Sequence, residues 1–196
     1  MAVDRERVAE LVRELLEAIG EDPDRPGLRS TPARVADAYA EFFAGVGEDA
    51  AAPLAHTISV TRGPAPDTLP SGAVMLRDVR FRSVCEHHLL PFAGRAHLAY
   101  LPGEQVVGLG ALPRVIDVLA ARPQVQERLG EQIADTIAGS LDTRGVLVVL
   151  DAVHECVTMR GGRQGDTSTV TIAARGDLAD PAARAEIIAL LTGGAP

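Results

Sequence analysis

The sequence is poor in aromatic residues and in cysteine. The 196-residue chain has no tryptophan, aromatic residues make up 3%, and there are two cysteines. Hydrophobic residues nevertheless make up 46%, so we expect a sizeable core built from aliphatic side chains. In a reducing cytosol, two cysteines are expected to be free thiols or metal ligands rather than a disulfide.

The chain also lacks a long apolar run and an excess of positive charge. No stretch approaches the roughly 18 apolar residues of a membrane span, and the charged N-terminal segment has no apolar signal core. We therefore expect a cytoplasmic protein without membrane contact. The net charge of −8 argues against a nucleic-acid partner, because an extended nucleic-acid surface needs a basic face. It leaves room for a local basic pocket that binds a phosphorylated small molecule.

The first 70 residues predict two helices and a connector. Apolar residues at helical spacing predict a helix over 4–19. Thr31 and Pro32 predict a second helix that runs to about Ala44, with the threonine as N-cap and the proline at the first helical position. Residues 46–71 are rich in Ala, Pro and Gly and predict a connector. We expect residues 1–70 to form a helical extension and residues 71–196 to form the main domain.

The main domain predicts two strand pairs that flank two helices. The expected strands are 74–81, 96–101, 145–156 and 167–173, the helices between them are 108–121 and 124–141, and a last helix covers 181–192. The order β-β-α-α-β-β predicts an α+β class, with an antiparallel four-stranded sheet and two helices on one face. Alternation along 145–156 predicts that His154 and Cys156 lie on the same face of the sheet.

Cysteine and histidine gather in two distant segments. Cys85-Glu86-His87-His88 and His154-Glu155-Cys156 hold both cysteines and three of the five histidines. Zinc takes thiolate and imidazole ligands, and a catalytic zinc site keeps three protein ligands and a water. We therefore predict one zinc site. Its ligands are Cys85 and His88, which lie in a predicted loop, and Cys156 as the third. His87 and His154 then lie beside the metal, where imidazoles are suited to moving protons.

The spacing leaves two other interpretations open. A closed structural site would use Cys85, His88, Cys156 and either His87 or His154 as four ligands. Both cysteines would otherwise be buried as small apolar residues, which the adjoining histidines disfavour. His97, on a predicted strand, is expected to make a structural hydrogen bond.

Polar residues outside the two segments suggest ligand binding. The stretch Gln124-Val125-Gln126-Glu127-Arg128 opens a predicted helix, where a glutamate is also favourable through the helix dipole alone. A glutamine amide and the glutamate carboxylate of this stretch are the alternative, a functional pair. As a pair they would read a base edge, since a carboxylate accepts both the N1–H and the 2-amino group of guanine. Arg160 and Arg163 follow the second cysteine segment, and arginine binds phosphate bidentately. A solvated turn is the simpler interpretation for one isolated arginine.

Five stretches taken together carry a family resemblance. They are residues 21–28 with 31–35, then 85–92, 122–129, 154–156 and 159–161. In this order they closely resemble GTP cyclohydrolase I over about residues 20–176. The resemblance implies a tunnelling-fold (T-fold) subunit, with residues 71–196 as the T-fold catalytic domain. It also implies a toroidal homodecamer with sites at the subunit interfaces.

The resemblance further implies a reaction and roles for single residues. In the family, zinc-activated water adds to C8 of GTP, the imidazole ring opens, formate leaves, and the ribose rearranges to give 7,8-dihydroneopterin triphosphate, on the route to tetrahydrofolate or another pterin. The implied roles are zinc binding by Cys85, His88 and Cys156, guanine binding by Gln126 and Glu127, phosphate binding by Arg114 and Arg160, substrate contact by Leu109, and proton transfer by His87 and His154.

One stretch departs from the family. Where the family has Gly-Leu-Ser-Lys, this chain has Gly108-Leu109-Gly110-Ala111. The serine and lysine belong, in the family, to the ribose and triphosphate end of the pocket. A hydrogen bond to a charged group is worth about 1.5–3 kcal/mol, so GTP should bind more weakly unless Arg163 or Arg95 substitutes.

This departure opens two alternatives to a GTP cyclohydrolase I. The first is a paralogue that acts on another guanine nucleotide or nucleoside, or that stops at a ring-opened intermediate. The second is a non-catalytic zinc- or pterin-binding assembly protein. The nitrile-reducing relatives of this fold are disfavoured, because they need a nucleophilic cysteine and both cysteines here match metal positions.

Overall fold

The computed structural model describes residues 3–59, 72–160, 165 and 167–192. The last part of the expected connector, residues 60–71, lies outside the described residues, and so do Gly161 and Arg163. No helix in the described ranges is long and apolar enough to cross a membrane.

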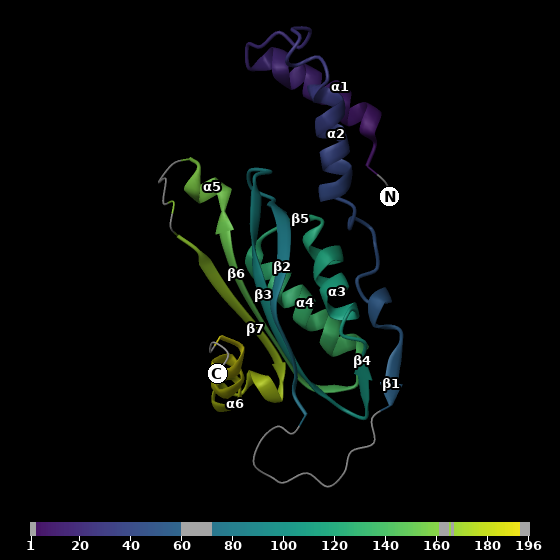
Figure 1. Cartoon of the computed structure of the whole chain (residues 1–196), viewed down its shortest axis with the longest axis vertical. Helices are drawn as coiled ribbons and strands as arrows, with labels where there is room; N and C mark the ends of the chain where they lie inside the picture. The colour runs from purple at the N-terminus through teal and green to yellow at the C-terminus, as the bar shows by residue number, and fades with distance from the viewer. Residues whose placement is uncertain (1–2, 60–71, 161–164, 166, 193–196) are drawn as a thin grey trace.

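The predicted N-terminal helix pair is confirmed. Helix α1 (Arg5–Ala18) and helix α2 (Thr31–Phe42) lie together at one end of the molecule, beyond the sheet (Figure 1). The Asp4 carboxylate caps α1 by accepting a hydrogen bond from the backbone N–H of Arg7. The start of α2 differs from the prediction, because Ser30 is its N-cap and makes no side-chain capping bond. The backbone N–H of Thr31 donates instead to the carbonyl of Leu28, so a preceding turn leads directly into the helix.

The main body is the predicted antiparallel sheet with a short addition. Its strands are β2 (Val74–Cys85), β3 (Pro91–Pro102), β5 (Pro123–Gln124), β6 (Thr143–His154) and β7 (Thr169–Gly176), in the order β5-β2-β3-β6-β7. The four long strands are antiparallel, and the two-residue β5 pairs parallel with the end of β2. Strands β2 and β3 are longer than predicted, so that Cys85 is the last residue of a strand rather than part of a loop.

Two helices cover one face of the sheet, as predicted. They are α3 (Ala111–Ala120) and α4 (Gln126–Ser140), and Figure 1 shows them on the side opposite α6 (Pro181–Thr192). Leu98 and Leu150 pack against α3 and α4 in the main core, whereas Leu147 and Val149 pack in a second cluster that includes Ile187 of α6. Because both faces are covered there, residues 145–150 are buried without alternation.

Part of the expected connector has structure. It contains the short 3₁₀ helix η1 (Ala52–Leu54) and β1 (Thr57–Ser59), which pairs antiparallel with β4 (Gln105–Val107). Leu54 is almost fully buried in the main core. A second 3₁₀ helix, η2 (Asp177–Ala179), joins β7 to α6.

The predicted strand over 145–156 is wrong at its end. Strand β6 ends at His154, and residues Glu155–Thr158 form a single helical turn, α5. The last pair of the β3–β6 ladder joins Phe92 to His154. The preceding residue of β3 is Pro91, which has no backbone N–H to extend the ladder. Cys156 therefore lies on α5 and not beside His154 on the sheet.

Candidate metal centre

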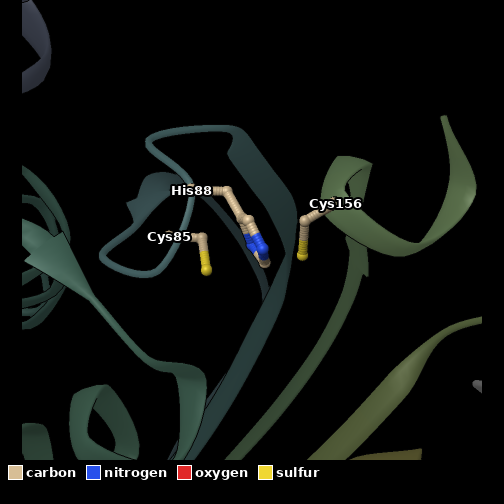
Figure 2. Close-up of side chains that lie close together, drawn as sticks. All are labelled: Cys85, His88 and Cys156. Carbon is tan, nitrogen blue, oxygen red and sulfur yellow. The ribbon is translucent and has the colours of Figure 1, made fainter. Parts of the chain in front are cut away.

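Cys85, His88 and Cys156 meet at one place although they come from three different elements. Cys85 ends β2, His88 lies in the turn to β3, and Cys156 lies on α5. One ligand atom from each residue lies within 4.8 Å of those of the other two. Figure 2 shows the two thiols and the imidazole gathered in the space between the β2–β3 turn and α5. The structure thus brings together the three metal ligands that the sequence predicted.

Backbone hydrogen bonds hold the turn that carries His88. The N–H of Cys85 donates to the carbonyl of Leu90 over 2.8 Å, and the N–H of Leu89 donates to the carbonyl of Cys85 over 2.8 Å. Leu89 has a φ of 52°, a left-handed conformation that a non-glycine residue rarely adopts. The N–H of Glu86 donates to the carbonyl of Gln124, which fixes the turn to β5. The local backbone is therefore tied at both ends of the Cys85–His88 segment.

The chemistry of the three side chains fits a zinc ion. Burial, and then the neighbouring Cys85 thiol, raise the pKa of the Cys156 thiol. Two adjacent thiols oppose each other's ionisation, because two thiolates repel. A bound cation lowers the pKa of both thiols instead, because thiolate is the form that binds metal. Two sulfur donors and one imidazole are typical zinc ligands. Within the described ranges the group holds no fourth Cys, His, Asp or Glu.

His154 lies beside this group and is held on two sides. Its ring stacks on the ring of Phe92, with centroids 4.6 Å apart and planes 4° from parallel. Its Nε2 atom lies 2.7 Å from Oε1 of Gln126. Burial lowers the pKa of His154, while the carboxylate of Glu127 acts in the opposite direction. The neutral imidazole is therefore favoured in this surrounding.

Gln126 and Glu127 differ sharply in exposure. The side chain of Gln126 is buried, with 1% exposed. Its Nε2 group donates to the carbonyls of Leu150 and Thr169, at 3.0 and 2.8 Å, and to Oγ1 of Thr171 at 3.2 Å. Glu127 is exposed at the first turn of α4. The predicted base-reading pair is thus divided into a buried amide and an exposed carboxylate.

The remaining predicted residues are at the surface. His87 is exposed, and its ring meets that of His88 edge to face, with centroids 6.3 Å apart. Leu109 is 60% exposed just before α3, and Arg114 is exposed on α3. Arg160 is exposed after α5, where its charge acts to lower the pKa of the Cys156 thiol. That effect places Arg160 near the metal group.

Two contacts of the site were not predicted from the sequence. The stacking of Phe92 on His154 could not be predicted, because in the sequence Phe92 is one apolar strand residue among several. Glu86 forms an ion pair with Arg128, and the hydrogen bond from this guanidinium holds the pKa of the Glu86 carboxyl below its usual range. Arg128 also donates to Oε1 of Gln124 over 3.0 Å. The charge pattern Glu86…Arg128 was visible in the sequence, but nothing there joined the two positions.

A cavity among the described residues lies away from these side chains. It has a volume of about 750 Å³ and lies between the end of α2, α3 and β2, where Glu41, Arg80, Arg82 and Asp117 are among its lining residues. None of the predicted metal, proton-transfer or substrate residues lines it. The metal group lies outside this cavity, and of its three residues Cys85 is buried, Cys156 is half-buried and His88 is exposed.

Comparison with known proteins gives one consistent result. The family model described as GTP cyclohydrolase I matches residues 8–192. GTP cyclohydrolase 1 of Leifsonia xyli subsp. xyli is 63% identical over 192 residues, which cover 98% of this chain and 97% of that protein. GTP cyclohydrolase 1 of Bacillus subtilis is 48% identical over 188 residues, which cover 95% of each chain. The span matched by the family model contains most of α1, all of α2, the sheet and the three positions of the metal group.

Proposed function

The chain belongs to the GTP cyclohydrolase I family, and from this premise we propose that it hydrolyses GTP at C8, releases that carbon as formate and forms 7,8-dihydroneopterin triphosphate. The observation that carries the proposal is the meeting of Cys85, His88 and Cys156, whose ligand atoms lie within 4.8 Å of one another. Such a group fits a hydrolytic metal centre better than a binding protein, because it leaves a coordination position for water.

The metal proposed for this group is zinc. The two thiols and the imidazole hold it, and the ion when bound supplies a Lewis acid that brings the pKa of water toward 7. Cys85 and His88 are kept in register by the hydrogen-bonded turn. Cys156 approaches from α5, because β6 stops at His154 and the chain turns there.

The guanine base is assigned to the exposed carboxylate of Glu127. A carboxylate accepts the N1–H and the 2-amino hydrogen together, which distinguishes guanine from adenine. The sequence also predicted a guanine contact for Gln126, but the amide of Gln126 has its partners inside the subunit. Arg114 and Arg160 are proposed for the phosphates, since guanidinium binds phosphate bidentately. Leu109 supplies an exposed apolar contact.

Proton transfer is proposed for His87 and His154. His87 adjoins His88 and His154 lies two residues before Cys156, and imidazole exchanges protons near neutral pH. His87 is exposed. His154 is stacked on Phe92 and held by Gln126, so its position is fixed. Ring opening needs several proton movements, and two imidazoles in different surroundings, one exposed and one half-buried, suit different steps.

Assembly into a homodecamer, with the sites completed by neighbouring subunits, remains a proposal. It is supported by the exposure of three residues expected at the site, His88, Leu109 and Arg114. The division into a helical extension, residues 1–70, and a T-fold catalytic domain, residues 71–196, is proposed in the same way. The cytoplasmic location stays a prediction.

The two alternatives that rest on Gly110 and Ala111 are not favoured. A relative that is 63% identical over nearly the whole chain is named GTP cyclohydrolase 1. The metal group and Glu127, which would act on C8 and on the base, are present. We therefore treat Gly110 and Ala111 as a variation within the proposed activity.

The test is a coupled assay on zinc-loaded protein with GTP. Formate release and the fluorescence of neopterin after oxidation are both measured, and we expect comparable rates. Formate without neopterin would mean that ring opening is uncoupled from the sugar rearrangement. If neither product forms while zinc is bound stoichiometrically, GTP is not the substrate, and GMP and guanosine are assayed next.

A further inference from the structure

The amide of Gln126 has only one chemically acceptable orientation. On one side it faces the carbonyl oxygens of Leu150 and Thr169, at 3.0 and 2.8 Å. On the other side it faces Nε2 of His154 at 2.7 Å. Carbonyl oxygens accept hydrogen bonds and never donate them. The NH₂ group must therefore point to the two carbonyls, because the reversed amide would place oxygen against oxygen twice in a buried position.

This orientation determines which nitrogen of His154 carries a proton. With its NH₂ group turned to the carbonyls, Gln126 presents Oε1 to the imidazole, and Oε1 is purely an acceptor. Nε2 of His154 must therefore donate, which means that it is protonated. In the neutral ring the other nitrogen, Nδ1, then carries the lone pair. No hydrogen bond within the described ranges involves Nδ1.

We propose that Gln126 is a positioning residue that fixes His154 as the Nε2–H tautomer, so that His154 exchanges protons with the substrate only through Nδ1. A proton taken up at Nδ1 gives an imidazolium that keeps its Nε2–H bond to Gln126. Loss of the same proton from Nδ1 to a leaving group restores the neutral ring. Gln126 neither gains nor loses a proton in this exchange.

Phe92 completes the arrangement by fixing the ring plane. The two rings are 4° from parallel with centroids 4.6 Å apart, and Phe92 is 1% exposed. Stacking stops the imidazole from tilting, and the hydrogen bond to Gln126 stops it from rotating in its plane. Together they direct Nδ1 to a single place, which general acid–base catalysis requires.

The role of Gln126 is then to position His154 and not to bind the guanine base. A residue that reads the guanine base would contribute equally to binding of the substrate and of the transition state, and its loss would raise KM. A residue that sets the tautomer of a proton-transfer group would change kcat instead. The buried amide, with 1% exposed and every polar atom paired inside the subunit, supports the second role.

The direct test is the tautomer itself in the assembled, zinc-loaded protein. Solid-state NMR of protein labelled with ¹⁵N-histidine distinguishes protonated from unprotonated ring nitrogens without a size limit. The signals of His154 are assigned from their loss in a His154→Asn variant. We expect a protonated Nε2 and an unprotonated Nδ1. An unprotonated Nε2 in the neutral ring would overturn the inference, whatever the substrate of the enzyme is.

The second test compares two variants kinetically. Gln126→Met keeps the length of the side chain but removes its acceptor, and we expect kcat for formate release to fall roughly 10- to 100-fold with KM changed less than about twofold. The matched control is Thr171→Val. It removes only the longest contact of the Gln126 NH₂ group, at 3.2 Å, and leaves both carbonyl partners. It should leave kcat and the ¹⁵N spectrum unchanged.

The two tests separate the inference from the function on which its kinetic part rests. A rise of KM in Gln126→Met with kcat unchanged would show a base-reading residue and refute the positioning role. An inactive wild-type protein with the expected ¹⁵N pattern would count against GTP as substrate but not against the tautomer. If Gln126→Met fails to fold, the wild-type spectrum alone still decides the tautomer.

Discussion

The imidazole of His154 and the phenyl ring of Phe92 lie face to face, with planes 4° from parallel, at the last pair of the β3–β6 ladder. The sheet register thus places a buried aromatic ring directly against a group that we assign to proton transfer. A second aromatic contact leads away from the site, since Phe92 meets Phe81 edge to face with centroids 6.1 Å apart. These two contacts allow the stacking of His154 to be tested separately from core packing.

Replacing Phe92 by leucine should affect both stability and turnover. Phe92→Leu removes the flat partner of His154 and leaves a smaller buried side chain, so we expect a loss of about 1–2 kcal/mol in unfolding free energy and a severalfold fall in kcat. The matched control is Phe81→Leu, which alters the same core without touching His154. Thermal denaturation and formate release measure both effects. Equal kcat in the two variants would show that stacking has no catalytic consequence.

Removing one metal ligand should remove the metal and the activity together. Cys156→Ser and His88→Ala should each bind less than one zinc per chain and release formate more than about 100-fold more slowly, because the Lewis acid is lost. Zinc content is measured by atomic spectroscopy after dialysis. His56→Ala changes an exposed histidine outside the site and should keep full zinc content. Stoichiometric zinc in both ligand variants would refute the assignment.

Glu127 should govern recognition of the base. In Glu127→Gln we expect KM for GTP to rise about 10- to 100-fold, the equivalent of a charged hydrogen bond worth about 1.5–3 kcal/mol. Inosine triphosphate lacks the 2-amino group, so the preference of the wild-type enzyme for GTP over this analogue should largely vanish in the variant. Glu131→Gln, one turn further along α4 and paired with Arg175, serves as the control. An unchanged preference in Glu127→Gln would exclude the carboxylate from base binding.

The Glu86–Arg128 pair should give the fold an acid-sensitive contribution. The hydrogen bond from Arg128 lowers the pKa of Glu86 in the folded state. The pair therefore stabilises the fold above the unfolded-state pKa of about 4.3, and this contribution disappears as the pH falls through the lower, folded-state pKa. We expect a small Tm difference between wild type and Glu86→Gln that is constant near neutral pH and vanishes in acid. Melting curves of zinc-free protein between neutral and acidic pH measure this difference. A difference that grows in acid would contradict the assignment.

The pair Gly110 and Ala111 can be tested by restoring the residues of the family. The double variant Gly110→Ser with Ala111→Lys adds a hydroxyl at the N-cap of α3 and an ammonium group at its first residue. We expect KM for GTP to fall about tenfold, because one charged contact to a phosphate is gained, while KM for guanosine stays the same. An equal change for both substrates would show that the lysine does not reach the triphosphate.

Local patterns in the sequence were sufficient for the long helices and strands and for the candidate metal ligands. Helices α1, α3 and α4 follow apolar periodicity, and the chemistry expected of Cys85, His88 and Cys156 follows from residue type. The end of β6 could not be predicted in this way. It is set by Pro91 on the partner strand, which is far away in the sequence and stops the ladder at His154.

Contacts between distant residues account for what the sequence did not reveal. Gln126 and His154 form a pair only because α4 packs on β6 and β7, which places the carbonyls of Leu150 and Thr169 on one side of the amide and His154 on the other. Spacing along the chain gives no sign of this pairing. The resemblance to the family suggested residues for the base, but it did not show that one of them is buried and the other exposed.

The triangle of Cys85, His88 and Cys156 has a structural consequence of its own. It lies where β2 ends and where β6 gives way to α5, so a bound ion ties together two chain segments roughly 70 residues apart. The ion would then have two roles. It would be a reagent, and it would be a removable cross-link between the two segments. Zinc shortage would therefore expose this protein to unfolding at the same time as it stops turnover, and the amount of folded protein would follow the supply of the metal.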